Sequence, residues 1–136
     1  MAKLGEITKA MQSRALQALD GVKKAVSLPS WSKLTFKLEE DGKTIHLLNN
    51  HTVKGKGYQQ SIAAGGRKGV FPEWMSDKQI FRNIREAYEN SKKIETQIDN
   101  LTGEKTVKLI GKSKDGMEIE MYVNTTTKQL NTAYPK

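Results

Sequence analysis

The fold is decided by one stretch of the chain, residues 106–123, which reads TVKLIGKSKDGMEIEMYV. Near its end apolar residues alternate with Glu118 and Glu120, and a period of two is typical of a strand that buries one face. The KDG sequence at 114–116 is typical of a hairpin turn. The stretch therefore predicts two antiparallel strands, and a third short strand is expected from about residue 129 to 134.

A helix is expected directly before this stretch, from Ser76 to about Lys92. Ser76 is a favourable N-cap, and Gln79 three residues later completes the pattern of a capping box. The apolar residues that follow recur at helical spacing. They are Ile80, Phe81, Ile84, Ala87 and Tyr88.

Two elements are expected further upstream. Residues 34–38 and 44–48 favour extended structure on either side of a turn at 40–43, which predicts a hairpin. Residues 3–26 carry apolar side chains mostly three or four apart, which predicts an amphipathic helix that ends before Pro29.

The predicted order is helix, two strands, loop, helix and three strands, which indicates an α+β fold with an N-terminal helix and an antiparallel sheet packed with helices. We expect residues 1–30 to be an N-terminal helical segment or linker. Residues 31–136 are then the folded domain.

The composition of the 136 residues excludes several classes of site. The absence of cysteine excludes a disulfide scaffold, a thiolate nucleophile and a zinc site built on cysteine. With only two histidines, most other transition-metal sites lack ligands, and we expect no metal and no cofactor. No apolar run approaches the roughly 20 residues of a membrane-spanning helix. Catalysis must therefore use histidine, lysine, carboxylate or hydroxyl groups.

A formal net charge of +8 favours an anionic partner. The segment 51–70 contains no acidic residue and several glycines, and we expect a flexible basic loop there. Its candidate RNA-binding residues are Lys54, Lys56, Tyr58 and Arg67, with the tyrosine as a stacking platform. The alternative is a solvated loop whose charges have no ligand.

His46 and His51 are only five residues apart. Two imidazoles, one neutral and one protonated, can cleave RNA without a metal, and Lys68 can stabilise the charge of the transition state. The alternatives are a histidine packed in a strand for His46 and a turn residue for His51.

Thr132 and Tyr134 lie near the C-terminus in a segment that is expected to be extended. Alternation places their hydroxyls on one face, about 7 Å apart, where they can hold a phosphate or a base edge. Threonine and tyrosine are also ordinary strand formers, so a purely structural role is the alternative.

Three motifs together resemble the bacterial EndoU nuclease family. They are FPEWMSDKQI at 71–80, the hairpin with Gly-x-x-x-Asp-Gly at 111–116, and TAYP at 132–135. The resemblance covers about residues 44–136 and implies the barnase/EndoU/colicin/RelE-like fold. Members of the family are typically toxin domains at the C-terminal ends of secreted polymorphic or contact-dependent inhibition proteins.

The resemblance also implies a set of catalytic residues. His51 matches a catalytic histidine upstream of the FP motif, and Lys68 matches a lysine just before it. Thr132 and Tyr134 match the terminal Thr-x-Tyr pair. His46 has the local context of the second family histidine but lies closer to the first than is usual.

The function that the resemblance implies is a metal-independent endoribonuclease toxin used in interbacterial competition. It would cleave RNA, with tRNA among the candidate substrates, to a 2′,3′-cyclic phosphate. We would expect secretion or cell-surface delivery within a larger toxin, action in the target-cell cytoplasm, and a cognate acidic immunity protein. The alternatives are a non-catalytic RNA-binding module that uses residues 51–70, and an interaction domain that assembles through residues 3–26.

Overall fold

Five strands form the central sheet of the protein, seen in a computed structural model that describes residues 28–66 and 69–136. The strands are β1 (Thr35–Phe36), β2 (Lys92–Ile98), β3 (Lys105–Lys112), β4 (Glu118–Asn124) and β5 (Gln129–Pro135). Their order across the sheet is β1-β5-β4-β3-β2, and neighbours run antiparallel except for β1, which is parallel to β5. The predicted α+β fold is confirmed, and the sheet is mixed rather than wholly antiparallel.

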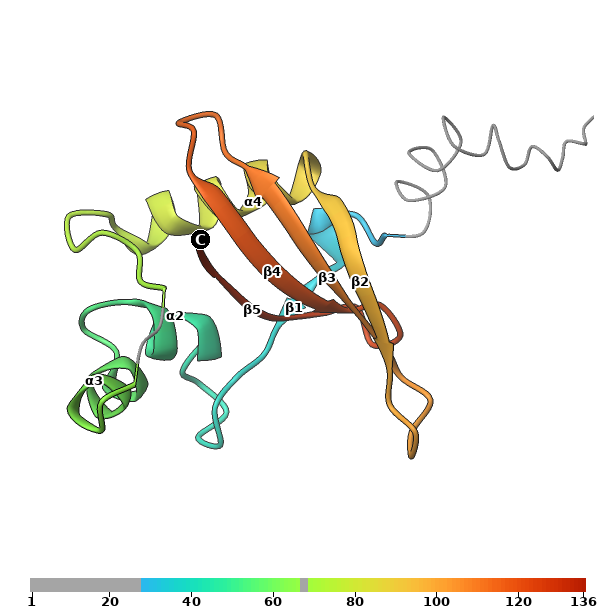
Figure 1. The fold of residues 1–136 in the computed structure, drawn as a ribbon, viewed down its shortest axis with the longest axis horizontal. Coiled ribbons are helices and arrows are strands. Elements are labelled where there is room, and N and C mark those ends of the chain that lie inside the picture. Colours follow the sequence, from blue (N-terminus) through green and yellow to red (C-terminus); the bar gives the residue numbers. More distant parts are fainter. Residues whose placement is uncertain (1–27, 67–68) are drawn as a thin grey trace, which may run out of the picture. The chain divides into compact units, whose positions relative to one another are not determined.

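Three α-helices accompany the sheet in the described part of the chain. They are α2 (His46–His51), α3 (Lys56–Ala63) and α4 (Asp77–Glu89), and a short 3-10 helix, η2 (Trp31–Lys33), precedes β1. Figure 1 shows α4 running across the sheet and α2 and α3 grouped together, with α2 next to β5. None of these helices is long and apolar enough to cross a membrane. The helix predicted for residues 3–26 lies outside the described residues, and the domain boundary at residue 30 stays a prediction.

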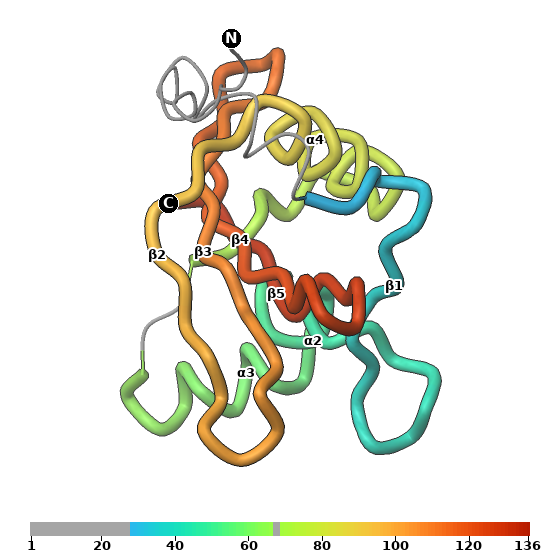
Figure 2. Tube along the Cα trace, turned by 90° about the vertical axis from the view of Figure 1, so that its right-hand side faces the viewer, coloured from blue at the N-terminus to red at the C-terminus, as the bar shows by residue number. Residues whose placement is uncertain are grey.

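Helix α4 begins and packs as its sequence predicts. Ser76 Oγ accepts a hydrogen bond from the backbone N–H of Gln79, and the Gln79 side chain accepts one from the backbone N–H of Ser76. This is a complete capping box, which satisfies two backbone donors at the start of the helix. The apolar face of α4 contacts β3 and β4, and Figure 2 shows the helix against the strands from a second direction.

The core lies between α4 and one face of the sheet. Its strand residues are Val107, Leu109, Ile119, Met121, Val123, Leu130 and Ala133. Ile84 and Ala87 of α4 are fully buried against this face. Gly111 allows the helix to approach β3 closely, because a Cβ atom there would lie 1.9 Å from the carbonyl oxygen of Ala87.

The prediction of a hairpin from residues 34–38 and 44–48 is wrong for its second strand, because most of that segment is helical. Leu38 and Ile45 form a single antiparallel bridge, and the chain then enters α2. Side-chain contacts stabilise this short helix, because Asn49 and Asn50 both donate hydrogen bonds to Glu39. Glu39 is ten residues before Asn49, so local alternation did not reveal this contact.

The basic segment contains a helix, α3, where the sequence predicted a flexible loop. A Cβ atom at Gly55 would lie 2.1 Å from the carbonyl oxygen of Asn49, and one at Gly57 would lie 2.7 Å from the side-chain oxygen of Asn50. These two glycines therefore serve the close packing of α3 on α2 rather than flexibility.

Strand β2 is missing from the sequence prediction, which also extended the preceding helix to about Lys92 although α4 ends at Glu89. All seven residues of β2 are exposed, so no alternation of burial marks it as a strand. Among the described residues it pairs with β3 alone, which makes it the edge strand on that side of the sheet. Figure 1 shows the β2–β3 hairpin projecting beyond the rest of the sheet.

The close approach of α4 to β3 predicts that Gly111→Ala destabilises the protein. The added methyl group must displace the Ala87 backbone, and overpacking of this kind costs about 1–3 kcal/mol. Urea unfolding measures the change in the free energy of unfolding. Lys112→Ala, at the exposed neighbouring position of β3, is the control and is expected to change it by less than about 0.5 kcal/mol. Equal stability of the Gly111→Ala variant and the wild type would contradict this account of the packing.

Candidate active site

The strands that bury one face beneath α4 carry polar side chains on the other. Leu109, Met121 and Ala133 are fully buried, so their neighbours in sequence lie on the opposite face of the sheet. We call this opposite face the polar face; its residues are Lys108, Ile110, Glu120, Tyr122, Thr132 and Tyr134. The cross-strand register places Glu120 directly beside Tyr134.

His51, the last residue of α2, packs against Tyr134. The two ring centroids are 4.8 Å apart, with 35° between the ring planes. His51 Nδ1 lies 2.7 Å from the carbonyl oxygen of Gly69. Because a carbonyl oxygen only accepts, Nδ1 carries a proton, and in the neutral imidazole the lone pair lies on Nε2. His51 is therefore held in the tautomer in which Nε2 is the basic atom.

The segment that follows α3 fixes His51 from a second side. The backbone N–H of Phe71 donates to the carbonyl oxygen of His51 at 2.8 Å. A Cβ atom at Gly69 would lie 2.4 Å from the carbonyl oxygen of Pro135 and 3.2 Å from Cδ1 of Tyr134. Glycine therefore lets this segment pass close to the end of β5, where its carbonyl meets His51.

Glu120 joins three side chains of the polar face through one oxygen. The hydroxyls of Tyr134 and Tyr122 both donate to Glu120 Oε2, the second at 3.1 Å, and Lys108 Nζ lies 3.6 Å from the same oxygen. Burial raises the pKa of Glu120, but the two hydroxyls and Lys108 outweigh it, so the pKa lies below its ordinary value. Burial, followed by the hydrogen bond to Glu120, raises the pKa of Tyr134 well above its ordinary value. At neutral pH the carboxyl is ionised and the phenol is protonated.

Thr132 shares the polar face with Tyr134, as the sequence predicted. Its Oγ1 is buried and has no hydrogen-bond partner among residues 28–66 and 69–136. Buried hydroxyls in proteins usually have a partner. The structure gives no hydrogen bond to the described residues that explains why this hydroxyl is buried.

His46 lies on a different side of α2. Five residues correspond to about 140° around a helix axis, so the two histidine side chains diverge. His46 Nδ1 lies 3.0 Å from Glu39 Oε2, and the same carboxylate oxygen accepts hydrogen bonds from Asn49 and Asn50 at 2.9 and 3.1 Å. The structure thus brings His51 to Tyr134, and brings His46 to a carboxylate. The catalytic role predicted for His46 stays a prediction.

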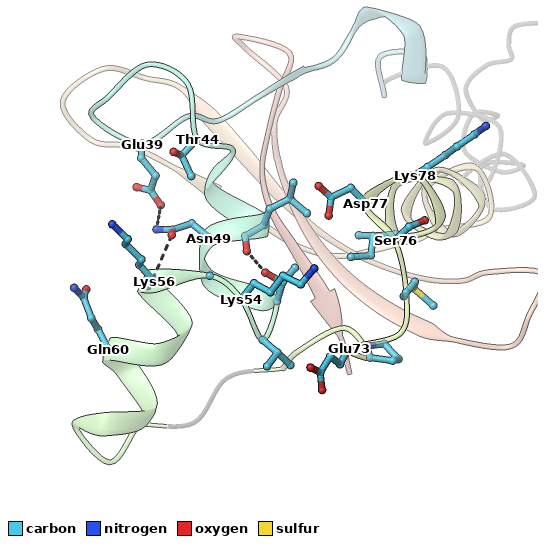
Figure 3. A pocket seen from close by; sticks show the side chains of 18 of the residues that line it. Glu39, Thr44, Asn49, Lys54, Lys56, Gln60, Glu73, Ser76, Asp77 and Lys78 are labelled. Atoms are coloured by element: carbon cyan, nitrogen blue, oxygen red, sulfur yellow. Dashed lines mark hydrogen bonds between the residues drawn. The ribbon is translucent and has the colours of Figure 1, made fainter.

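A groove of about 980 Å³ lies beside α2, with residues of α3 and of the start of α4 along it. Figure 3 shows Glu39 and Asn49 joined on one wall and Ser76 and Asp77 on the other. The predicted RNA contacts Lys54 and Lys56 line this groove, whereas His51, Thr132 and Tyr134 do not. Its charged lining residues are Glu39, Asp41, Glu73 and Asp77 against Lys54, Lys56 and Lys78. With four carboxylates and three ammonium groups, the groove lacks the positive character that binds a phosphate backbone.

The remaining predicted site residues are placed as follows. Tyr58 is half-buried in α3, while Arg67 and Lys68 lie outside the described residues. Across the described ranges, no cluster of three or more His, Cys, Asp or Glu side chains could hold a metal ion.

Three further residues share the polar face with the predicted ones and were not predicted from the sequence: Lys108, Glu120 and Tyr122. The signal that identifies them was present, because the alternation that buries Met121 places Glu120 and Tyr122 on the same face as Tyr134. The register of β3 is also needed to add Lys108, and the register is a tertiary feature.

The family model for bacterial EndoU nucleases matches residues 32–136, which include every strand and α-helix described above. No curated protein and no solved structure matches the chain.

The Glu39 cluster predicts a pH-dependent contribution to stability. The hydrogen bond from Asn49 lowers the pKa of Glu39 most; burial opposes it, and His46 and then Asn50 lower the pKa further. A lowered folded-state pKa stabilises the fold above the ordinary value of 4.5, and this stabilisation is lost as the pH falls. We expect Glu39→Gln to be less stable than the wild type by about 0.5–1 kcal/mol at pH 7, with the difference gone near pH 3.

Urea unfolding at both pH values measures this difference. Glu40→Gln, at the exposed neighbouring position, is the matched control and is expected to behave as the wild type at both. A Glu39→Gln deficit of the same size at pH 3 and pH 7 would show that the charge of Glu39 is not involved.

Proposed function

Because this chain belongs to the bacterial EndoU nuclease family, we propose that it is an endoribonuclease that cleaves RNA at the His51–Tyr134 pair without a metal ion. The observation that carries the proposal is the contact of the His51 ring with Tyr134, with Nδ1 of His51 bonded to a carbonyl. Because Nδ1 donates to that carbonyl, Nε2 is the basic atom whenever the imidazole is neutral, and a general base needs such an atom.

The proposed reaction is an intramolecular transesterification. His51 Nε2 accepts the proton of the ribose 2′-hydroxyl, and O2′ forms a bond to the adjacent phosphorus. The bond between phosphorus and O5′ breaks, and a general acid protonates the leaving 5′-oxygen. The products are a 2′,3′-cyclic phosphate and a 5′-hydroxyl, and no oxidant, reductant or water is consumed.

The other groups of the polar face support this step by hydrogen bonding and charge. Tyr134 is a neutral phenol whose O–H donates to Glu120, so its oxygen can accept a hydrogen bond from a ribose hydroxyl. Thr132 stays a predicted residue of the site. The ammonium group of Lys108 lies on the same face and can stabilise the negative charge that develops on the phosphate. Lys68 stays a predicted cation of the site, and the second predicted catalytic histidine, His46, is our candidate for the general acid.

We also propose that the domain acts as a toxin. A nuclease of this family would be delivered from a larger secreted protein to the cytoplasm of a target cell. The producing cell would then need an immunity protein against it. A net charge of +8 supports an acidic contacting face on that inhibitor, because complementary charge accelerates association.

The test is cleavage of total RNA by purified protein in the presence of a chelator. We expect fragments that end in a cyclic phosphate, and we expect His51→Ala to lower the rate by at least about 100-fold, the usual contribution of a positioned general base. RNA binding without cleavage by the wild type would instead identify a non-catalytic RNA-binding module.

His46→Ala tests the predicted second histidine in the same assay. A loss of at least about 100-fold would support its role as general acid. A rate close to that of the wild type would assign His46 to the Glu39 cluster alone. Thermal unfolding of each variant shows whether the fold is intact.

A further inference from the structure

We propose that Glu120 is a positioning residue of the His51–Tyr134 site, and that it holds the Tyr134 ring against His51 by accepting the hydrogen bond of the tyrosine hydroxyl. For catalysis this inference rests on the proposed function. The arrangement of the side chains can be tested without it.

The position of Glu120 needs an explanation because the carboxylate is buried. Glu120 is 9% exposed and lies in the middle of β4, beside Tyr134 of β5. A buried carboxylate is costly unless hydrogen bonds and an opposite charge compensate it, and here two hydroxyls and Lys108 do so. A compensated buried ion pair adds little net stability compared with apolar residues of similar size. The main effect of the buried Glu120 carboxylate is therefore to hold the side chains bound to it in position.

The geometry fixes Tyr134 at both ends of its ring. At the far end, the hydroxyl is bound to Glu120 Oε2. At the near end, Cδ1 and Cβ lie close to Gly69, and one face of the ring packs on His51. Without an acceptor at position 120, the hydroxyl end is released and the ring can rotate away from His51.

Glu120 is not suited to transfer a proton itself. Each group bound to its Oε2 is a donor, and together they hold its pKa below the ordinary value of 4.5. It is therefore ionised at neutral pH and cannot act as an acid there, and the three donors at Oε2 stabilise the ionised carboxylate and so weaken it as a base. This favours a positioning role over a catalytic one.

The first arm of the experiment measures the position of the Tyr134 ring by NMR. The ring current of Tyr134 shifts the imidazole protons of His51, whose signals are assigned by their absence from His51→Ala. Tyr134→Leu gives the shifts without the ring. We expect Glu120→Leu to move the His51 signals most of the way to these values, and Glu120→Gln, which keeps an acceptor oxygen, to stay near the wild type. Glu118→Ala, an exposed glutamate two residues away on the same strand, is the matched control.

The second arm measures RNA cleavage in a double-mutant cycle. We expect Glu120→Leu to lower kcat by about 10- to 100-fold with KM nearly unchanged, since a misplaced group can cost this much. In a Tyr134→Phe background the same substitution is expected to have less than about a twofold effect, because the hydroxyl through which Glu120 acts is gone. Losses that multiply would show that Glu120 acts independently of Tyr134.

The two arms separate failure of the inference from failure of the proposed function. Wild-type protein that does not cleave RNA would overturn the proposed function, and the NMR arm would still decide the position of the ring. Folded Glu120→Leu with wild-type His51 shifts would overturn the inference, whatever the activity. If Glu120→Leu does not fold, Glu120→Ala and Glu120→Asp, which also withdraw the acceptor from Tyr134, replace it in both arms.

Discussion

The burial of one sheet face beneath α4 is the constraint on which the rest of the structure depends. Leu109, Met121 and Ala133 must point towards the helix, and Gly111 must be small enough for the Ala87 backbone to approach. Because side chains alternate along a strand, the residues between them are forced onto the opposite face. The core and the candidate active site are thus two faces of the same three strands.

The arrangement of the polar face depends in turn on the buried carboxylate of Glu120, which two tyrosine hydroxyls and Lys108 stabilise. Glu120 accepts the hydroxyl of Tyr134, which anchors the ring, and burial together with this hydrogen bond keeps Tyr134 neutral. The anchored ring forms the surface on which His51 packs, and the carbonyl of Gly69 sets the tautomer of His51. Folding therefore completes the arrangement of these side chains before any substrate arrives, which is the form of preorganisation that enzymes use.

The elements that could be predicted from the sequence are those specified by local signals. The Ser76 capping box and the alternation of β4 act within a few residues, and both are confirmed. Helix α2 depends on hydrogen bonds from Asn49 to Glu39, and α3 packs through Gly57, so neither has a sufficient local pattern. Strand β2 is exposed along its whole length and exists only through its pairing with β3.

The residues of the candidate site could likewise be predicted only where a local sequence pattern identifies them. Alternation placed Thr132 and Tyr134 on one face, and it also puts Glu120 on the face opposite Met121. A glutamate in that position is usually solvated, so the burial of Glu120 could not be predicted. Its burial follows from neighbours on other strands, above all Tyr134 and Lys108. Sequence alone does not specify such contacts between strands.

The short helix α2 places its two histidines in different surroundings. Groups that act on one phosphodiester must reach it directly or through one water. A separation of about 140° around the axis turns His46 towards Glu39, next to a groove of mixed charge, and turns His51 towards the polar face. The opposite charges of the groove nearly cancel, whereas the net charge of +8 favours the approach of RNA to the protein as a whole. The proposed cleavage therefore rests on the His51–Tyr134 pair and its supporting carboxylate, rather than on the spacing of two histidines in the sequence.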